Sequence, residues 1–406
     1  MQKGRSEKVA LFCFIFKFFS ERKKNQHRPS TFQFASYISI RMKYYLIAGE
    51  ASGDLHGSNL IKELQKLDPN AQIRFWGGDK MKASGATLVK HYKELAFMGF
   101  AEVIKNLPEI LKNFKFCKSD ITAFQPDVVI FIDYPGFNLR MAKWAKENNY
   151  KTVFYISPQV WAWKENRVKN IKKYIDKMLV ILPFEKDFYK KWNYEVEYVG
   201  HPLVKVIEDF KKHHPEIRVS GNTVALLPGS RKQEIEAKLP VMLQATKNFP
   251  EHQFVVGKAP STEDEFYDSF IKDYKNVKVM SNDTYSLLMK SEAALVTSGT
   301  ATLETALFGV PEIVCYKASN ISYHIAKRLV KLKFISLVNL IMNKEVVKEL
   351  IQTDLTADKI TVNLKKILFD SEKKQQLKQD YAALKLLLSE GGNASENAAK
   401  NIYSLL

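Results

Sequence analysis

The sequence lacks the marks of several common protein classes. Its three cysteines (Cys13, Cys117 and Cys315) lie far apart with no C-x-x-C pair, so neither a zinc site nor a disulfide framework is indicated, and we expect a reducing compartment. The P-loop pattern is absent, which disfavours a P-loop NTPase, and no G-x-G-x-x-G turn supports dinucleotide binding. No apolar run approaches the ~18–20 residues that span a bilayer. The run over residues 9–16 is far shorter, and Lys17 interrupts it.

Acidic residues are scarce relative to basic ones. The chain has 62 Lys and Arg against 44 Asp and Glu, a net charge of +18, of which residues 1–41 contribute +7. Such an excess indicates an anionic partner, which is a nucleic acid, a membrane surface or a phosphorylated substrate. No known nucleic-acid module is present and the lysines are dispersed, so nucleic acid is disfavoured.

What is present is typical of a soluble globular protein. Hydrophobic residues make up 46% and charged residues 26% of 406 residues, enough for two or three domains at roughly 150 residues each. Residues 1–41 precede the first expected strand, and we expect Met42 to be the true start, with this extension outside the fold. The alternatives are an interfacial anchor or a secretion signal, although no convincing cleavage site follows.

From Met42 onward, expected strands and helices alternate, which predicts an α/β protein with largely parallel sheets. The first series of strands is expected at residues 44–49, 72–78, 127–133, 152–157, 178–183 and 196–200. The second is expected at residues 223–229, 253–257, 277–281, 293–299 and 311–317. The charged segment 210–222 is the expected connector, and the tail from about 343 is expected to be helical. We therefore predict two Rossmann-like halves with a cleft between them.

Ligands of such sheets bind at the carboxyl ends of the strands, where two segments of the first half carry candidate side chains. Segment 49–57 (GEASGDLHG) places Glu50, Ser52 and Asp54 on a small-residue turn. The alternative is a tight turn with Ser52 or Asp54 as a helix cap. In segment 132–138 (IDYPGFN), Asp133 ends a hydrophobic strand and can act as a general base, the alternative again being a helix cap.

Two segments of the second half suit an anionic ligand. Segment 227–235 (LPGSRKQEI) joins a Gly-Ser turn to Arg231 at a helix start, which suits a diphosphate, although an exposed basic turn would look the same. Segment 297–306 (TSGTATLETA) also opens a helix, and Glu304, one turn inside it, can accept hydrogen bonds from sugar hydroxyls. Its alternative is an acid favoured by the helix dipole. Two such helix starts fit one nucleoside diphosphate.

Segment 97–118 combines an apolar stripe with four lysines. This pattern is typical of an interfacial helix on an anionic membrane, and the alternative is that the stripe belongs to the core. The membrane-patch candidates are Met98, Phe100, Val103, Ile104, Leu107 and Leu111.

At these residues the chain resembles the lipid-A-disaccharide synthase family of bacterial glycosyltransferases. The similarity runs from Met42 nearly to the end and leaves out residues 1–41. It is carried by segments 49–57, 98–104, 132–138, 155–167, 182–189, 198–203, 227–235, 297–311 and 336–352.

The resemblance implies a GT-B fold, with residues 42–205 as an N-terminal acceptor and membrane domain joined by the C-terminal helix of about 385–406. Residues 206–384 would form the UDP-sugar-binding domain. It also implies transfer of 2,3-diacylglucosamine from UDP to the 6-hydroxyl of 2,3-diacylglucosamine 1-phosphate (lipid X) with inversion. No metal or other cofactor is expected. The implied location is the inner face of the cytoplasmic membrane, and the oligomeric state stays open, a homodimer being one option.

The resemblance also assigns roles by position. Asp133 matches the family's essential aspartate, while Glu50, Ser52 and Asp54 would face a sugar. Lys164 and Arg167, beside two tryptophans, are our own candidates for the acceptor's phosphate. The expected UDP-binding residues are Gly229, Ser230, Arg231, Ser298, Gly299, Thr300, Thr302, Glu304 and Asn339.

One departure and three rival functions remain. Many relatives carry an acid where this chain has Gly136, which puts in doubt any mechanism that needs two carboxylates in that loop.

The rivals are another UDP-sugar transferase such as the peptidoglycan N-acetylglucosaminyltransferase, a UDP-sugar epimerase, and a non-enzymatic membrane scaffold. Lipid-dependent activity separates the first two from our choice, and UDP binding excludes the third.

Overall fold

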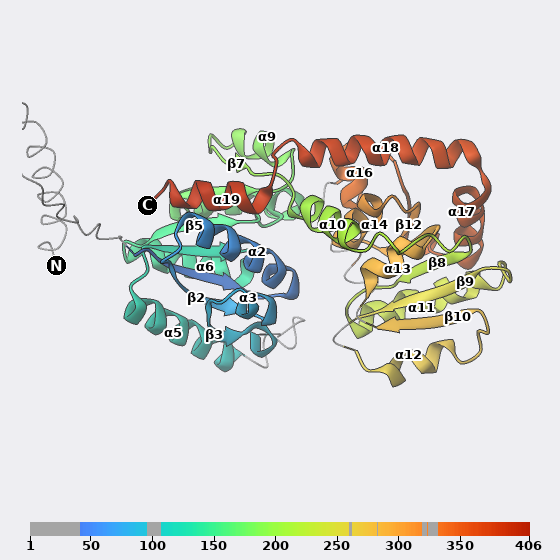
Figure 1. The fold of residues 1–406 in the computed structure, drawn as a ribbon, viewed down its shortest axis with the longest axis horizontal. Coiled ribbons are helices and arrows are strands. Elements are labelled where there is room, and N and C mark those ends of the chain that lie inside the picture. The colour runs from blue at the N-terminus through green and yellow to red at the C-terminus, as the bar shows by residue number, and fades with distance from the viewer. Residues whose placement is uncertain (1–40, 96–106, 260–261, 282, 319–322, 324–331) are drawn as a thin grey trace, which may run out of the picture. The chain divides into compact units, whose positions relative to one another are not determined.

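The computed structural model describes residues 41–95, 107–259, 262–281, 283–318, 323 and 332–406 (Figure 1). The contacts within the chain divide it between Ile40 and Arg41. The unit that begins at Arg41 holds two parallel sheets, which confirms the predicted α/β class.

The first sheet has seven parallel strands in the order β3-β2-β1-β4-β5-β6-β7. Its strands are β1 (Lys43–Ala48), β2 (Gln72–Gly77), β3 (Thr87–His91), β4 (Val128–Ile132), β5 (Lys151–Tyr155), β6 (Lys177–Val180) and β7 (Glu197–Tyr198). The central strands are nearly continuous apolar runs because helices cover both of their faces.

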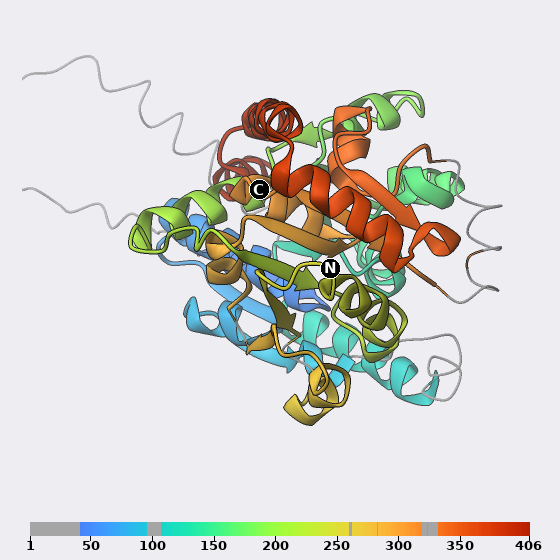
Figure 2. The same ribbon diagram turned by 90° about the vertical axis from the view of Figure 1, so that its right-hand side faces the viewer.

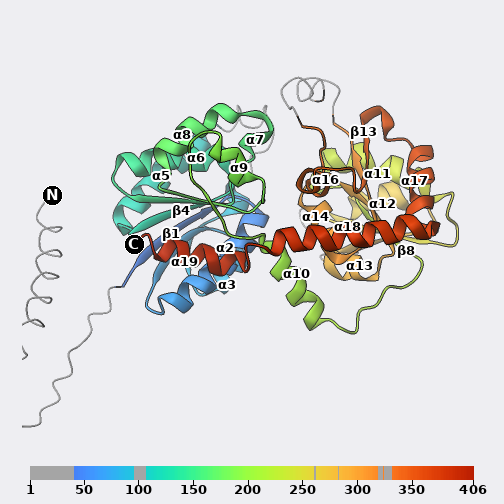
Figure 3. The same ribbon diagram turned by 90° about the horizontal axis from the view of Figure 1, so that it is seen from above.

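Successive side chains of β1 point to opposite faces of this sheet. Tyr45 and Ile47 pack with α5 (Leu107–Phe124), α6 (Pro135–Glu147) and α8 (Val168–Tyr174). Tyr44 and Leu46 pack with α2 (Ala51–Leu67), α3 (Asp79–Ala83) and α19 (Ala394–Tyr403). Figure 3 shows these two layers of helices on either side of the sheet.

The second sheet has six parallel strands in the order β10-β9-β8-β11-β12-β13. These are β8 (Thr223–Leu227), β9 (Gln253–Lys258), β10 (Val277–Ser281), β11 (Ala293–Thr297), β12 (Glu312–Tyr316) and β13 (Lys348–Ile351). Helices α11 (Lys232–Thr246) and α17 (Ala357–Phe369) pack on one face, and α13 (Thr284–Lys290) packs on the other (Figure 2).

The strand order places the ligand-binding edge of each sheet. In the first sheet the order reverses between β1 and β4, and in the second it reverses between β8 and β11. Crevices at the carboxyl ends of strands form where such reversals occur. The four segments singled out from the sequence follow these four strands.

The chain passes between the two sheets twice, and the two passages touch. One is the turn at Gly200, before α10 (Pro202–His213), and the other is Gly391, between α18 (Ser371–Ser389) and α19. A Cβ at Gly391 would collide with the backbone of Gly200. The backbone N–H of His201 donates to Leu388 O at 3.2 Å, and the Tyr198 hydroxyl bonds the same carbonyl. Helix α19 then packs on α2, while the domain boundaries at 205 and 385 stay predictions.

Two strands were not expected. β3 and β13 are short edge strands whose sequences, TLVKH and KELI, mix polar and apolar residues. The prediction of a wholly helical tail is wrong at β13.

The remaining elements are η1 (Tyr92–Leu95), α7 (Val160–Trp163), η2 (Glu165–Arg167), α9 (Glu185–Lys190), α12 (Asp264–Ile271), α14 (Thr300–Phe308), α16 (Leu337–Met342) and η3 (Gln352–Asp354). No helix among the described residues is long and apolar enough to cross a bilayer.

Candidate functional site

A cavity of about 680 Å³ lies where the carboxyl edges of both sheets contribute side chains. From the first half it is lined by Glu50, Ser52, Asp133 and Gln159. From the second half it is lined by Leu227, Gly229, Ser230, Arg231, Glu234, Gly257, Lys258, Ala259, Thr284, Thr297, Ser298, Gly299, Thr300, Ala301 and Glu304. Ten of the predicted site residues therefore meet around one space, whose size suits a small-molecule ligand.

Asp133 reaches the cavity through an unusual backbone conformation. Asp133 and Tyr134 both have positive φ, 45° and 50°, which is rare for residues other than glycine. The buried Asn138 side chain stabilises this turn by donating to the carbonyl of Asp133 at 2.7 Å and to that of Ile132 at 3.3 Å. Ile156, directly after the neighbouring strand β5, has a φ of 68°, an outlier for a β-branched residue. Such strain gathers at functional sites.

The Asp133 carboxylate is held in an environment that disfavours its charge. Burial, and then the nearby charge of Glu50, raise its pKa from 3.8 to about 6, against a lowering hydrogen bond from the backbone of Tyr134. A carboxylate with this pKa is largely ionised at neutral pH and is still a stronger base than an ordinary aspartate. This combination suits a general base.

The turn after β1 and the turn after β4 contact each other at Gly49. A Cβ at this position would collide with the Tyr134 ring, so only glycine lets the two turns approach. Glu50 then stands at the N-cap of α2 in an extended conformation, without a side-chain capping bond. The Gly49–Tyr134 contact thus places Glu50 and Asp133 beside the same cavity.

The second half places two helix starts without a side-chain cap at this cavity. Arg231 and Gly299 are the N-cap residues of α11 and α14, and neither makes a side-chain cap bond. Among the other helices of the second half, α13, α16, α17 and α18 have a capping side chain and α12 has none. The first N–H groups of α11 and α14 are therefore available to an anion in the cavity.

Positive charge reinforces these helix starts. Arg231 is about half exposed and its guanidinium lies 3.3 Å from Glu234, an exposed contact that leaves other N–H groups for a ligand. Lys238 is only 2% exposed and donates to Thr297 Oγ1 at 2.6 Å, directly beneath the Gly229 turn. Burial lowers the pKa of this lysine. Together with Ser230 and Thr300, these groups suit a diphosphate.

Glu304 also lines this cavity. Its carboxylate accepts a hydrogen bond from the Tyr285 hydroxyl at 3.0 Å, and burial raises its pKa. The neighbouring Ser298 hydroxyl donates to Ile335 O at 2.8 Å, which ties the turn before α14 to the segment 335–336. The arrangement leaves a carboxylate oxygen for vicinal hydroxyls of a ligand.

Two of the predicted site residues, Asp54 and Thr302, make hydrogen bonds within the fold instead of lining the cavity. Asp54 is buried, and its carboxylate accepts the N–H groups of Gly78, Lys80 and Met81 at 2.7, 3.1 and 3.0 Å, so it caps α3. Thr302 is fully buried, and its hydroxyl donates to Gly299 O at 2.8 Å within its own helix. Neither residue lines the cavity, so neither is positioned to touch its ligand.

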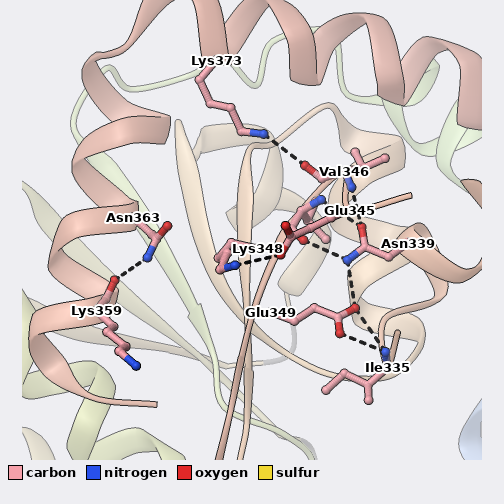
Figure 4. Close-up of polar contacts among 10 residues, drawn as sticks. Ile335, Asn339, Glu345, Val346, Lys348, Glu349, Lys359, Asn363 and Lys373 are labelled. Carbon is pink, nitrogen blue, oxygen red and sulfur yellow. Dashed lines mark hydrogen bonds and ion pairs between the residues drawn. The ribbon is translucent and has the colours of Figure 1, made fainter. Parts of the chain in front are cut away.

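Asn339 also lies away from the cavity, inside a network that Figure 4 shows. Its amide oxygen accepts the N–H groups of Val346 and Val347, and its amide nitrogen donates to Val347 O and to Glu349. With no exposed surface and all its hydrogen-bonding groups engaged, Asn339 cannot reach a nucleotide directly. Glu349 in turn accepts from the N–H of Ile335, whose carbonyl holds Ser298. Asn339 is therefore connected to the cavity only indirectly, through Glu349, Ile335 and Ser298.

Lys164 and Arg167 line a different hollow, next to Trp163. The Lys164 ammonium lies 4.1 Å from the Trp163 ring centre, and the Arg167 guanidinium lies 5.6 Å from it. Trp163 itself is 47% exposed. These cations are therefore available to a ligand, but outside the cavity that Asp133 lines.

Several lining residues were missed from the sequence, among them Gln159, Glu234, Lys258 and Thr284. Gln159 stands in segment 155–167, where a strand ends, and that position is the only signal that would have found it. Lys258 ends β9, Glu234 lies in the first turn of α11 after β8, and Thr284 begins α13 after β10. No group of three or more His, Cys, Asp or Glu in the described part of the chain is placed to hold a metal ion.

Most of the predicted membrane patch lies outside the described residues. This holds for Met98, Phe100, Val103 and Ile104, and for the side chain of Leu107. On the described part of α5, Leu111 is 59% exposed and Phe116 is 47% exposed. Lys112 and Lys115 are exposed on the same helix.

Comparison with known proteins gives a consistent family. A family model described as lipid-A-disaccharide synthetase matches residues 44–402. The lipid-A-disaccharide synthase of Syntrophus aciditrophicus is 38% identical over 372 residues, which cover 89% of this chain and 97% of that protein. The protein of the same name from Coxiella burnetii (strain CbuK_Q154) is 37% identical over 370 residues, covering 89% and 98%.

Solved structures show the same architecture at low identity. The UDP-GlcNAc 2-epimerase from Neisseria meningitidis bound to UDP-GlcNAc aligns with a TM-score of 0.63 at 13% identity, over 89% of this chain and all of that chain. The glycotransferase of kitacinnamycin aligns with a TM-score of 0.64 at 13% identity, over 90% and 99%. These likenesses bear on the fold alone and confirm the GT-B type. By sequence and fold together, the chain belongs to the lipid-A-disaccharide synthetase family, and it is a glycosyltransferase of lipid A biosynthesis.

Proposed function

We propose that the chain transfers 2,3-diacylglucosamine from UDP to the 6-hydroxyl of 2,3-diacylglucosamine 1-phosphate, with inversion at the anomeric carbon. The observation that carries this proposal is the position of Asp133. Its carboxylate, with a pKa raised to about 6, lines the same cavity as two uncapped helix starts. A base on one side and anion-binding groups on the other are what an inverting transfer from a nucleoside diphosphate requires.

The second half would hold UDP. Gly229, Ser230 and Arg231 would bind the diphosphate with the N–H groups of α11, and Ser298, Gly299 and Thr300 would do so at the start of α14. Glu304 would accept hydrogen bonds from the ribose hydroxyls. As the bond from the anomeric carbon to the diphosphate breaks, negative charge grows on the departing UDP. Arg231 and the helix starts would stabilise that charge.

The first half would hold the acceptor and the donated sugar. Asp133 would take the proton of the acceptor's 6-hydroxyl while that oxygen attacks the anomeric carbon. Glu50 and Ser52 would contact a sugar, and Lys164 and Arg167 would face the acceptor's phosphate. Asp54, Thr302 and Asn339 are left out of the proposed contacts because their polar groups are engaged within the fold.

The acyl chains of these substrates call for a lipid surface. Two exposed apolar side chains beside exposed lysines on α5 support a peripheral contact with an anionic membrane. The location at the inner face of the cytoplasmic membrane belongs to the same proposal.

The test is product formation from UDP-2,3-diacylglucosamine and lipid X in detergent micelles, with protein that begins at Met42. A disaccharide 1-phosphate and one equivalent of UDP are expected. If UDP binds and no disaccharide forms, the acceptor is a different one and the proposal fails. The Arg231→Ala variant serves as the control for nucleotide binding.

A further inference from the structure

A second cavity lies in the first half, between helices α6 and α8, and shares Arg167 with the hollow next to Trp163 described above. It measures about 330 Å³ and begins at Pro135 and Gly136, directly after the Asp133 turn. Its remaining lining residues are Leu139, Arg140, Ala142, Lys143, Arg167, Asn170, Ile171, Tyr174 and Ile175. Its volume is sufficient for a headgroup or a small ligand.

The cavity has an apolar base and a cationic rim. Ala142, Ile171 and Ile175 are buried, while Arg140 and Lys143 are exposed and Arg167 is partly exposed. From Pro135 to Ile175 the chain has nine lysines and arginines and two glutamates. This stretch therefore carries a large part of the positive charge of the first half.

Each of the three rim cations lies over an aromatic ring. Arg140 lies over Phe114 at 5.9 Å, Lys143 over Tyr174 at 6.0 Å and Arg167 over Trp163 at 5.6 Å. Among the described residues, neither Arg140 nor Arg167 has a carboxylate partner, and Lys143 has only Glu147 at 3.9 Å. Aromatic contacts orient a cation but leave its N–H donors for another acceptor.

We infer that this α6–α8 cavity binds the phosphomonoester of an acylated substrate, in the proposed reaction the 1-phosphate of the acceptor. A phosphomonoester carries about −1.5 to −2 charges near pH 7, which two or three cations match, and it has three acceptor oxygens for their N–H groups. The apolar base suits the carbon-rich part of such an amphiphile. The inference rests on the proposed function for the identity of the ligand.

The position of the cavity relative to Asp133 fits this ligand. Gly136 is three residues after Asp133, so their Cα atoms are at most ~11 Å apart, since consecutive Cα atoms are separated by 3.8 Å. One sugar ring with its phosphate bridges a gap of this order. A Cβ at Gly136 would meet nothing within 4 Å, so the lining of the cavity is open space at this glycine.

The test uses the variant Arg140→Gln/Lys143→Gln, in which both substituted side chains are exposed and the core is untouched. Steady-state kinetics in nonionic micelles compare the phosphorylated acceptor with the same acceptor lacking its phosphate. We expect the KM for the phosphorylated acceptor to rise about 10- to 100-fold, as for the loss of charge-assisted hydrogen bonds. The KM for the donor, and the reaction of the phosphate-free acceptor, should not change. Lys143→Arg, which keeps the charge, should retain most of the affinity.

The matched control is Lys169→Gln/Lys190→Gln, which removes two exposed lysines that do not line the cavity. It should behave like the wild-type protein. Equal losses with both acceptors, or no loss with either, would overturn the inference. The headgroups of bilayer lipids are a second possible source of the phosphate, and vesicle flotation tests whether the cavity binds them. Loss of binding to anionic vesicles with unchanged kinetics in nonionic micelles would assign the cavity to bilayer headgroups and overturn its assignment to the acceptor.

A failure of the proposed function can be told apart from a failure of this inference. If the wild-type protein binds UDP but forms no disaccharide, calorimetric titration with lipid X in nonionic micelles still measures the affinity of the cavity for the phosphorylated ligand. Weaker binding by the double variant, but not by the control, would support the phosphate site. Equal binding by wild-type and double-variant protein would refute it.

Discussion

Ionisation of Asp133 lowers the free energy of unfolding, and unfolding experiments at several pH values can measure the difference. Its pKa is about 6 in the fold against 3.8 in the ordinary state. At 1.36 kcal/mol per pH unit, this difference corresponds to about 3 kcal/mol of stability that the wild-type protein loses as the pH rises from about 4 to about 6. An asparagine has no charge to desolvate and tolerates the left-handed conformation at this position. The Asp133→Asn variant should therefore be more stable than the wild-type protein above pH 6 by up to about 3 kcal/mol.

The same variant should lose roughly 10²–10⁴ in the rate of transfer, because it removes the base, while its affinity for UDP stays unchanged. Urea unfolding at pH 8, 6 and 4.5 should show a stability gain that shrinks toward low pH. Asp54→Asn is the matched control, and it should destabilise the protein, since the Asp54 carboxylate accepts three backbone N–H groups. A loss of stability in Asp133→Asn at pH 8, or an equal loss of UDP affinity, would refute the reasoning and give Asp133 a structural or nucleotide-binding role.

Two further predictions concern residues that line the cavity, and a third concerns Asn339, which lies away from it. Glu50→Gln removes a charge that raises the Asp133 pKa, so the acid limb of kcat/KM should move from about pH 6 toward, but not below, 3.8; an unmoved limb would exclude the coupling. Arg231→Ala should weaken UDP binding about 10-fold or more in calorimetry, with little change in stability because the side chain is half exposed; unchanged affinity would contradict its role. Asn339→Ala should lower the free energy of unfolding by about 2–4 kcal/mol, because it leaves several buried groups unpaired, and should weaken UDP binding only through Ser298. A large loss of affinity at unchanged stability would show that Asn339 contacts the nucleotide.

Much of the fold could be predicted because its central strands are continuous apolar runs. Each of the eleven expected strands overlaps an observed one, since residues such as Val129 and Ile130 are buried on opposite faces of the same strand. β3 and β13 escaped prediction because an edge strand has one paired side and keeps polar residues such as Lys90 and Glu349. Their β-structure depends on the neighbouring strand rather than on a local pattern.

The candidate site could be located from the sequence but not divided into contacting and supporting residues. Asp133 and Asp54 both follow strands that end at the same sheet edge, and only the fold shows that one faces the cavity and the other caps α3. Ser298 and Thr302 lie four positions apart in one motif, yet the hydroxyl of Thr302 bonds within its own helix. Hydrogen-bonding side chains near a helix start can serve either the helix or a ligand, and the sequence is the same in both cases.

Three residues with a disfavoured backbone conformation meet at one edge of the first sheet, and we argue that chemistry rather than folding accounts for the conformation of Asp133. Asp133, Tyr134 and Ile156 all have positive φ, and all follow β4 or β5. Each such conformation costs of order 1–3 kcal/mol, and the raised pKa of Asp133 adds a further loss at neutral pH. Ile156 and Tyr134 also contribute apolar surface to the core, whereas the Asp133 carboxylate contributes none. The carboxylate is instead held, by Asn138 and the Gly49–Tyr134 contact, beside the cavity that the starts of α11 and α14 also line. A protein that only bound UDP would gain nothing from this strain, whereas a transferase gains a positioned base.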